Sequence, residues 1–183
     1  MATLPTPLER FVQGILPENP VYRQFLGLCP TLAVTNGLKP AVTMALAVGF
    51  VLLGANVIIS LIRNLLRPHL RIVVFTLTIA TFVTIVDRVL AAYMYQMSKA
   101  LGPYIPLIIV NWIIFCRCEV CACGEPVTSA AAVAVGQSLV FGLALVSIAV
   151  VREILGTGML AGFQVLPEAW PDWVIMVLPP GAF

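Results

Sequence analysis

Charge is scarce in this chain. Lys, Arg, Asp and Glu make up 10% of its 183 residues, whereas 61% of the residues are hydrophobic and the mean hydropathy is +1.04. A water-soluble domain of this size carries about 25% charged residues. The deficit excludes a soluble globular protein and indicates an integral membrane protein, which we treat as one domain over residues 1–183.

Several functional motifs are missing as well. The sequence has one histidine, no His-rich metal motif, no phosphate-binding loop, no nucleophile triad and no surface for nucleic acid. The N-terminal stretch has no basic region followed by an uninterrupted apolar core, because Glu9, Arg10 and Glu18 lie within it. We therefore expect no cleavable signal peptide and no complete active site within this chain alone.

The spacing of the charges predicts the membrane spans. Residues 40–62 and 126–151 contain no charged residue, and each segment is long enough for a spanning helix of about 20 residues. A third apolar segment, 72–99, is interrupted by Asp87 and Arg88. It predicts a long or tilted helix with this polar pair toward one end.

Shorter apolar segments complete the pattern. Residues 24–38 and 101–116 are too short to span and contain Gly and Pro, which predicts broken or re-entrant helices covered by protein or lining a cavity. The apolar run from residue 173 predicts the opening of a sixth helix that is truncated in this chain. The alternative for that run is an amphipathic segment at the membrane surface.

The two halves of the chain are weakly similar. A short segment precedes KPAVTMALAVGFVLLGANVIIS in the first half and EPVTSAAAVAVGQSLVFGLALVS in the second. We interpret this as an all-α, polytopic fold of six helices in two inverted repeats, residues 21–100 and an incomplete 101–183. Such repeats place a site near the bilayer midplane, at paired broken helices. Chance similarity between Ala- and Val-rich helices is the alternative.

Arginine is distributed unevenly between the two predicted sides. Six arginines (10, 23, 63, 67, 71 and 117) fall on one side, whereas Lys39, Lys99 and Arg152 fall on the other, and Arg88 is assigned to neither. Because cytoplasmic loops are rich in Lys and Arg, we expect the N-terminus and the loop RNLLRPHLR to be cytoplasmic.

The candidate functional residues are cysteines and one aspartate. Cys29 lies in a broken segment, where a thiolate is a candidate ligand of an iron–sulfur cluster completed by a partner chain; a buried apolar role is the alternative. Four further cysteines (116, 118, 121 and 123) crowd one stretch, for which a local zinc site is a weaker interpretation than thiols without a ligand. Asp87 is a candidate for the ion pathway, or an interfacial residue beside Arg88, whose long side chain could reach the membrane surface.

Longer stretches carry a resemblance to a known family. Residues 19–35 (NPVYRQFLGLCPTLAVT) resemble the start of the family that comprises RnfE of the Rnf complex and NqrD of the sodium-pumping NADH:quinone oxidoreductase, Nqr. The similarity continues through RIVVFTLTIATFVTIVD (71–87), AAYMYQMSKALG (91–102), IPLIIVN (105–111), VREILGTG (151–158) and LPPGAF (178–183).

The resemblance implies a six-helix subunit of the bacterial inner membrane. It implies antiparallel packing against a sister subunit of the same fold, of RnfA or NqrE type, with each of the two giving two cysteines to a shared [2Fe–2S] cluster. Flavins and other iron–sulfur centres would lie in other subunits, and the whole complex would be an oxidoreductase that moves Na⁺ or H⁺.

One ligand position departs from the family pattern. The first family cysteine, in GLCP, is Cys29, but the second normally follows VN, where Trp112 stands here. Cys116 lies one helical turn further on the same face, so we predict it as the second ligand, with Cys118 as the fallback. Trp112 favours the alternative function, a cofactor-free ion-translocating or scaffold subunit.

Overall fold

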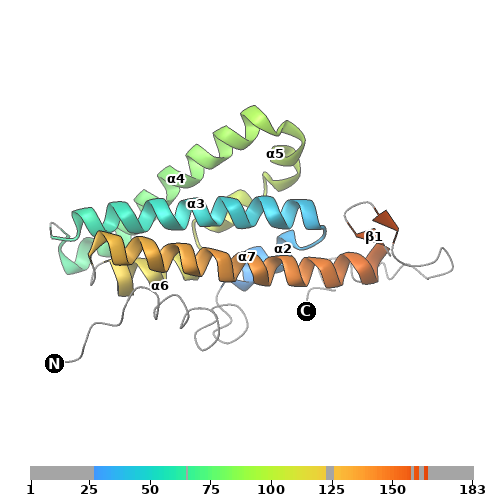
Figure 1. The fold of residues 1–183 in the computed structure, drawn as a ribbon. Helices are drawn as coiled ribbons and strands as arrows, with labels where there is room; N and C mark the ends of the chain where they lie inside the picture. Colours follow the sequence, from blue (N-terminus) through green and yellow to red (C-terminus); the bar gives the residue numbers. More distant parts are fainter. Residues whose placement is uncertain (1–26, 65, 123–125, 158, 161–162, 165–183) are drawn as a thin grey trace, which may run out of the picture.

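The computed structural model describes residues 27–64, 66–122, 126–157, 159–160 and 163–164 (Figure 1). Apart from one short pair of strands, this part of the chain is helical, as predicted. The elements are α2 (Leu28–Val34), α3 (Leu38–Ile62), η1 (Pro68–Leu70), α4 (Arg71–Tyr93), α5 (Tyr95–Leu101), η2 (Ile105–Ile108), α6 (Trp112–Arg117), the π-helical η3 (Cys118–Ala122), α7 (Val127–Thr157), β1 (Met159–Leu160) and β2 (Phe163–Gln164). β1 and β2 pair antiparallel.

Three helices are long and apolar enough to cross a membrane. They are α3 with 25 residues, α4 with 23 residues and α7, of which 30 residues pass this test. The spans predicted for residues 40–62 and 126–151 are thereby confirmed. The length of each follows from an uninterrupted run of apolar residues, since lipid leaves backbone groups no partner outside the helix.

Helices α3 and α7 form the centre of the molecule and run antiparallel side by side (Figure 1). Small residues set their separation. A Cβ on Gly49 would lie 3.2 Å from Ser138 Cβ, and a Cβ on Gly142 would lie 3.4 Å from Ala45 Cβ. Membrane helices approach closely where such small residues face each other, so this pair is packed by shape rather than by apolar character.

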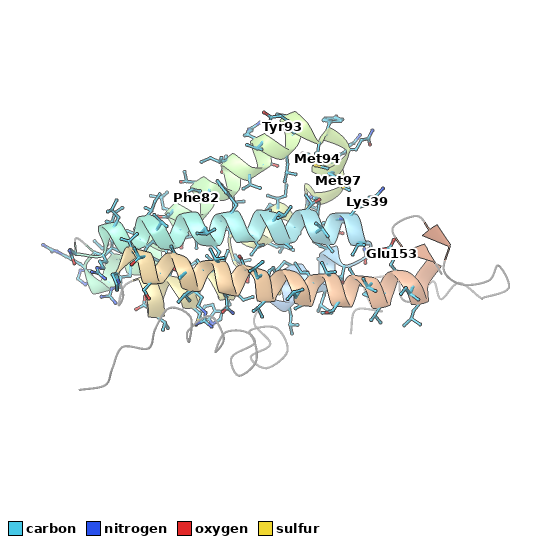
Figure 2. The ribbon with its side chains drawn as sticks, in the orientation of Figure 1. Lys39, Phe82, Tyr93, Met94, Met97 and Glu153 are labelled. Atoms are coloured by element: carbon cyan, nitrogen blue, oxygen red, sulfur yellow. The ribbon has the colours of Figure 1, made fainter. Side chains whose placement is uncertain are left out.

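Helix α4 crosses α3 near one end and then leans away from it (Figure 1). At the crossing, a Cβ on Gly54 would stand 2.6 Å from the ring of Phe82, which is labelled in Figure 2. Only 22% of the apolar window of α4 is buried, against 50% in α3 and α7. A groove of about 380 Å³, lined by Phe50, Val86 and Met94 among others, separates the two helices beyond the crossing.

The single helix predicted over residues 72–99 is confirmed as far as Tyr93 and is wrong beyond that residue. Helix α4 ends at Tyr93, and Met94 adopts φ −135° and ψ 64° before α5 begins at Tyr95. Tyr93, Met94 and Met97 mark this corner in Figure 2. The sequence around it contains neither Pro nor Gly. The sequence pattern typical of a helix therefore continues through Met94, although the helical backbone is interrupted there.

The short segments predicted to be broken helices are broken. The described part of the first segment before α3, residues 27–37, contains only the seven-residue helix α2. The second segment bends by 66° between α5 and the stretch Ile105–Val120. The predicted sixth helix, after residue 173, lies outside the described residues, and the two three-helix repeats remain a prediction.

Candidate functional site at the junction of two half-helices

The starts of α2 and α6 contact each other, although they are far apart in sequence. Gly27 precedes α2, and a Cβ at this position would lie 2.6 Å from Ile113 Cδ1 and 3.1 Å from Asn111 Oδ1. Gly27 also has φ 74°, a left-handed conformation that L-residues with a side chain disfavour. The space around residue 27 and its backbone conformation therefore both require glycine. Because residue 27 has no side chain, the stretch GLC (27–29) can contact the stretch VN (110–111).

Asn111 forms the other side of this junction. Its Oδ1 accepts a hydrogen bond from the backbone N–H of Ile113 at 3.2 Å, which caps the N-terminus of α6. Asn111 is 2% exposed, and its Nδ2 is buried without a hydrogen-bond partner among the described residues. On the α2 side, Thr31 Oγ1 donates to Gly27 O at 2.7 Å and closes the first turn.

The far end of α2 is fixed by α7. Arg152 Nη1 donates to Leu32 O at 3.1 Å and to Thr35 Oγ1 at 2.7 Å. Glu153 Oε2 accepts from the backbone N–H of Leu38 at 2.8 Å, which satisfies the start of α3. Arg152 and Glu153, which we call the α7 clamp, thus hold both sides of the α2–α3 turn, at the end of the bundle where Figure 2 labels Lys39 and Glu153.

The far end of α6 lies at the opposite end of the bundle. α6 continues into η3, where Glu119 Oε1 is 3.1 Å from Arg71 Nη1 at the start of α4. Since α3 and α7 are antiparallel, the α7 clamp and the start of α4 lie at opposite ends. The two half-helices therefore leave the junction in opposite directions, which is the arrangement that an inverted repeat would give.

Cys29 is the second residue of α2, and its side chain is exposed. Free cysteine is usually among the most buried residue types, so an exposed thiol beside the junction is unusual. Trp112, the first residue of α6, is 63% exposed and stacks on Phe115, with ring centroids 6.3 Å apart. Cys29 and Trp112, the two positions that the resemblance marked as candidate ligand sites, are thus each within two residues of the Gly27–Asn111 contact.

The other predicted ligands lie further along the α6–η3 segment. Cys116 is half-buried in a groove that Trp112 and Phe115 also line, and Cys118 is completely buried in the core. The side chain of Cys121 and all of Cys123 fall outside what the structure describes. Among the described residues no three His, Cys, Asp or Glu side chains are grouped closely enough to hold a metal ion.

Asp87, the candidate for an ion pathway, is half-buried near the end of α4, and its neighbour Arg88 is exposed.

Sequence reasoning missed other buried polar groups. Asn56 and Gln137 are almost fully buried in α3 and α7, and Asn56 Oδ1 and Gln137 Nε2 have no hydrogen-bond partner in the described part. In the sequence, each could have been recognised as a single amide within an apolar span. Such an amide needs a polar partner inside the membrane, as a charged side chain does.

Comparison with known proteins places the chain in a family. Residues 7–183 match the family described as Rnf-Nqr subunit, membrane protein. The chain is 43% identical to the E subunit of the Na(+)-translocating ferredoxin:NAD(+) oxidoreductase complex of Acetobacterium woodii, over 96% of this chain and 90% of that protein. It is 38% identical to the proton-translocating counterpart of Clostridium ljungdahlii, over 94% and 81%.

A relative from the second type of complex is similarly close. The chain is 40% identical to the D subunit of the Na(+)-translocating NADH-quinone reductase of a Shewanella species, over 96% of this chain and 87% of that protein. These relatives are subunits of oxidoreductase complexes by name. The residues that suggested the resemblance, GLCP and VN, are those that meet at the junction. The chain is a member of the Rnf-Nqr family of membrane subunits.

Proposed function

We propose that this chain is an electron-carrying membrane subunit of an Rnf- or Nqr-type complex, and that it shares a [2Fe–2S] cluster with a sister subunit of RnfA or NqrE type packed antiparallel to it. The complex would translocate Na⁺ or H⁺ across the inner membrane, since both ions occur in the names of the relatives. Other subunits would carry its flavins and remaining iron–sulfur centres.

The single observation that carries the proposal is the exposed thiol of Cys29 at the junction. Iron–sulfur clusters are typically held by four thiolates, and this junction offers one, so the rest must come from outside it. An exposed cysteine next to a packed, glycine-dependent contact is fixed in place yet open to a second subunit. The residues present therefore fit a cluster shared between chains and not one enclosed by this chain.

Once bound, the cluster would accept and release one electron at a time. The role of this chain would be to position the Cys29 sulfur and to limit the access of water. The Gly27–Asn111 contact positions the Cys29 sulfur, because it sets where α2 begins. Trp112, exposed at the start of α6, would shield one side. Cys116 remains the proposed second ligand of this chain, with Cys118 as the fallback.

Trp112 also supports a second candidate function. If no thiolate replaces the one that the family has at this position, the chain would be a cofactor-free ion-translocating or scaffold subunit. Buried amides in the spans, at Asn56 and Gln137, are compatible with such a role, since unpaired polar groups within a membrane commonly mark ion paths.

The test is the iron content and the electron paramagnetic resonance spectrum of the purified, reduced complex. We expect Cys29→Ser and Cys116→Ser each to remove the [2Fe–2S] signal assigned to this subunit, while Cys118→Ala leaves it unchanged. Loss of the signal in Cys118→Ala with its retention in Cys116→Ser would establish the fallback ligand. An unchanged signal in Cys29→Ser would refute the shared cluster and favour the cofactor-free function.

A further inference from the structure

Helix α4 has one face that the described part of the chain leaves exposed, at the edge of the bundle (Figure 1). The buried residues of α4, which belong to the core, are Phe75, Ile79, Val83 and Val86. On the opposite side of the helix lie five exposed residues that we call the α4 seam: Leu77, Thr81, Thr84, Arg88 and Ala91. They follow one another at intervals of four, three, four and three residues, so the seam keeps to one side of α4.

The spacing and the size of the seam residues suit a second helix. An average interval of 3.5 residues is the repeat by which two helices pack along each other at a small crossing angle. Thr81 Oγ1 donates to Leu77 O at 2.9 Å. Thr84 Oγ1 donates to Ala80 O at 2.8 Å, so both hydroxyls are satisfied within α4. Small residues of this kind are where membrane helices approach closely.

Arg88 adds a charge to this surface. An open hollow of about 500 Å³ lies on the seam and is lined by Thr81, Thr84, Ile85, Arg88 and Val89. The Arg88 side chain is exposed, and no hydrogen bond or ion pair joins it to another described residue. The guanidinium is therefore offered to whatever packs against the seam.

The position of Arg88 along α4 makes an unpaired charge costly. Arg88 stands 17 residues after Arg71, which is about 26 Å along a helix, whereas the hydrocarbon core of a bilayer is about 30 Å thick. Charged side chains within a span are nearly always paired. Asp87 does not serve as the partner, because adjacent residues of a helix do not face each other. The acceptor is therefore expected from outside the described residues.

We propose that the α4 seam binds a membrane-spanning helix of another subunit of the complex, and that this helix carries an aspartate or glutamate opposite Arg88. The chain belongs to a family of membrane subunits, so such helices surround it. The carboxylate would neutralise Arg88 and fix the register of the two helices, as a polar residue in a helical seam does. Lipid tails cover any apolar surface and require no regular spacing. No seam residue lines the groove that contains Trp112 and Cys116, so the contact does not depend on the proposed cluster.

The experiment places the photo-crosslinking residue p-benzoylphenylalanine at position 77, in the complex within its native membranes. Leu77 is a seam residue that is 68% exposed and lies about three turns from Arg88, so the probe leaves the proposed ion pair intact. Mass spectrometry identifies the peptide that is crosslinked on irradiation. We expect a spanning segment of another subunit, with an aspartate or glutamate about 11 residues from the crosslinked position, because paired helices advance together.

Charge exchange then tests Arg88. We expect Arg88→Glu to lower the yield of the adduct about tenfold, because like charges placed opposite each other disfavour association, and arginine in place of the partner's carboxylate to restore it. Thr84→Trp, which obstructs the seam without a change of charge, should lower the yield as well. Lys99→Glu is the matched control, because Lys99 is an exposed cation in α5, outside the seam, and it should leave the yield unchanged.

Several results would overturn the proposal. They are an adduct with lipid alone, an adduct within this chain, and a crosslinked segment without a carboxylate near the expected position. Equal losses in Arg88→Glu and Lys99→Glu would show that the charge acts on the whole complex and not at the seam. A loss in Arg88→Glu that the exchanged charge in the partner fails to restore would contradict the ion pair.

Discussion

A side-chain carbon on Gly27 would lie 2.6 Å from Ile113 Cδ1. This distance is shorter than real carbon–carbon contacts, so the two half-helices can meet only because residue 27 has no side chain. The contact is where the two short segments of the sequence become one site. It makes the position of Cys29 depend on Ile113, which belongs to the other half of the chain.

Gly27→Ala tests the junction. We expect a lower unfolding temperature of the complex, because an alanine at φ 74° costs about 1–2 kcal/mol and also overlaps Ile113. The iron content of the proposed cluster at Cys29 should fall in parallel. The readouts are thermal unfolding followed by size-exclusion chromatography, and iron content per complex.

Gly37→Ala is the control for that experiment. Gly37 precedes α3 with an extended backbone, and the nearest atom to an added Cβ is Pro40 Cδ at 3.5 Å, an ordinary contact. If both alanine variants unfolded at the same temperature, the junction would not depend on the shape of Gly27.

Arg152→Gln tests the α7 clamp. It removes the charged donor to Leu32 O and Thr35 Oγ1, and hydrogen bonds to charged groups contribute about 1.5–3 kcal/mol each. We expect a loss of stability in this range. Thr35→Val keeps the shape but removes one acceptor, so its effect should be smaller, and the double variant should lose less than the sum. Additive losses would mean that the two side chains do not act together.

Cys118 should be protected from alkylation. Its side chain is completely buried, so we expect N-ethylmaleimide to modify it only after the complex unfolds, as measured by the masses of peptides at increasing temperature. Modification of Cys118 in the native complex at the rate of the unfolded chain would contradict the burial of this residue in the core.

The orientation in the membrane can be tested at His69, which is exposed in η1. We expect a cysteine introduced by His69→Cys, in a background in which Cys29, Cys116, Cys121 and Cys123 are replaced by serine, to react with a membrane-impermeant maleimide in inverted vesicles only. Lys99→Cys, in α5 at the other end of the bundle, should react in right-side-out vesicles only. The reverse result would place the arginine-rich end outside the cytoplasm.

Some of this architecture could be predicted because charges in a membrane protein are informative. The spans within α3 and α7 were predicted from Lys39, Arg63 and Arg152, since a charge is costly in lipid, although α7 itself continues past Arg152 to Thr157. The break after Tyr93 could not be predicted, because no Pro or Gly accompanies it. The short helices were recognised from Gly and Pro, but neither residue reveals which distant segment a half-helix will touch.

The location of the junction was predictable to a similar extent, whereas its ligands remain a prediction. The sequence pointed to Cys29 and to the stretch around Trp112, and the structure brings their neighbours, Gly27 and Asn111, into contact. The role of Gly27 depends on the side chain of Ile113, and that of Arg152 on two groups at the end of α2. Such pairings are set by packing between distant segments, which local composition does not encode.

The α7 clamp has a consequence for how the protein is made. Arg152 lies 120 and 117 positions after Leu32 and Thr35, and Glu153 lies 115 positions after Leu38. The partners that satisfy the end of α2 and the start of α3 therefore leave the ribosome long after those segments have been synthesised. Until then, these hydrogen bonds at the end of α2 and the start of α3 cannot form, so the half of the junction that contains Cys29 is completed only after α7 is made, although it is synthesised first.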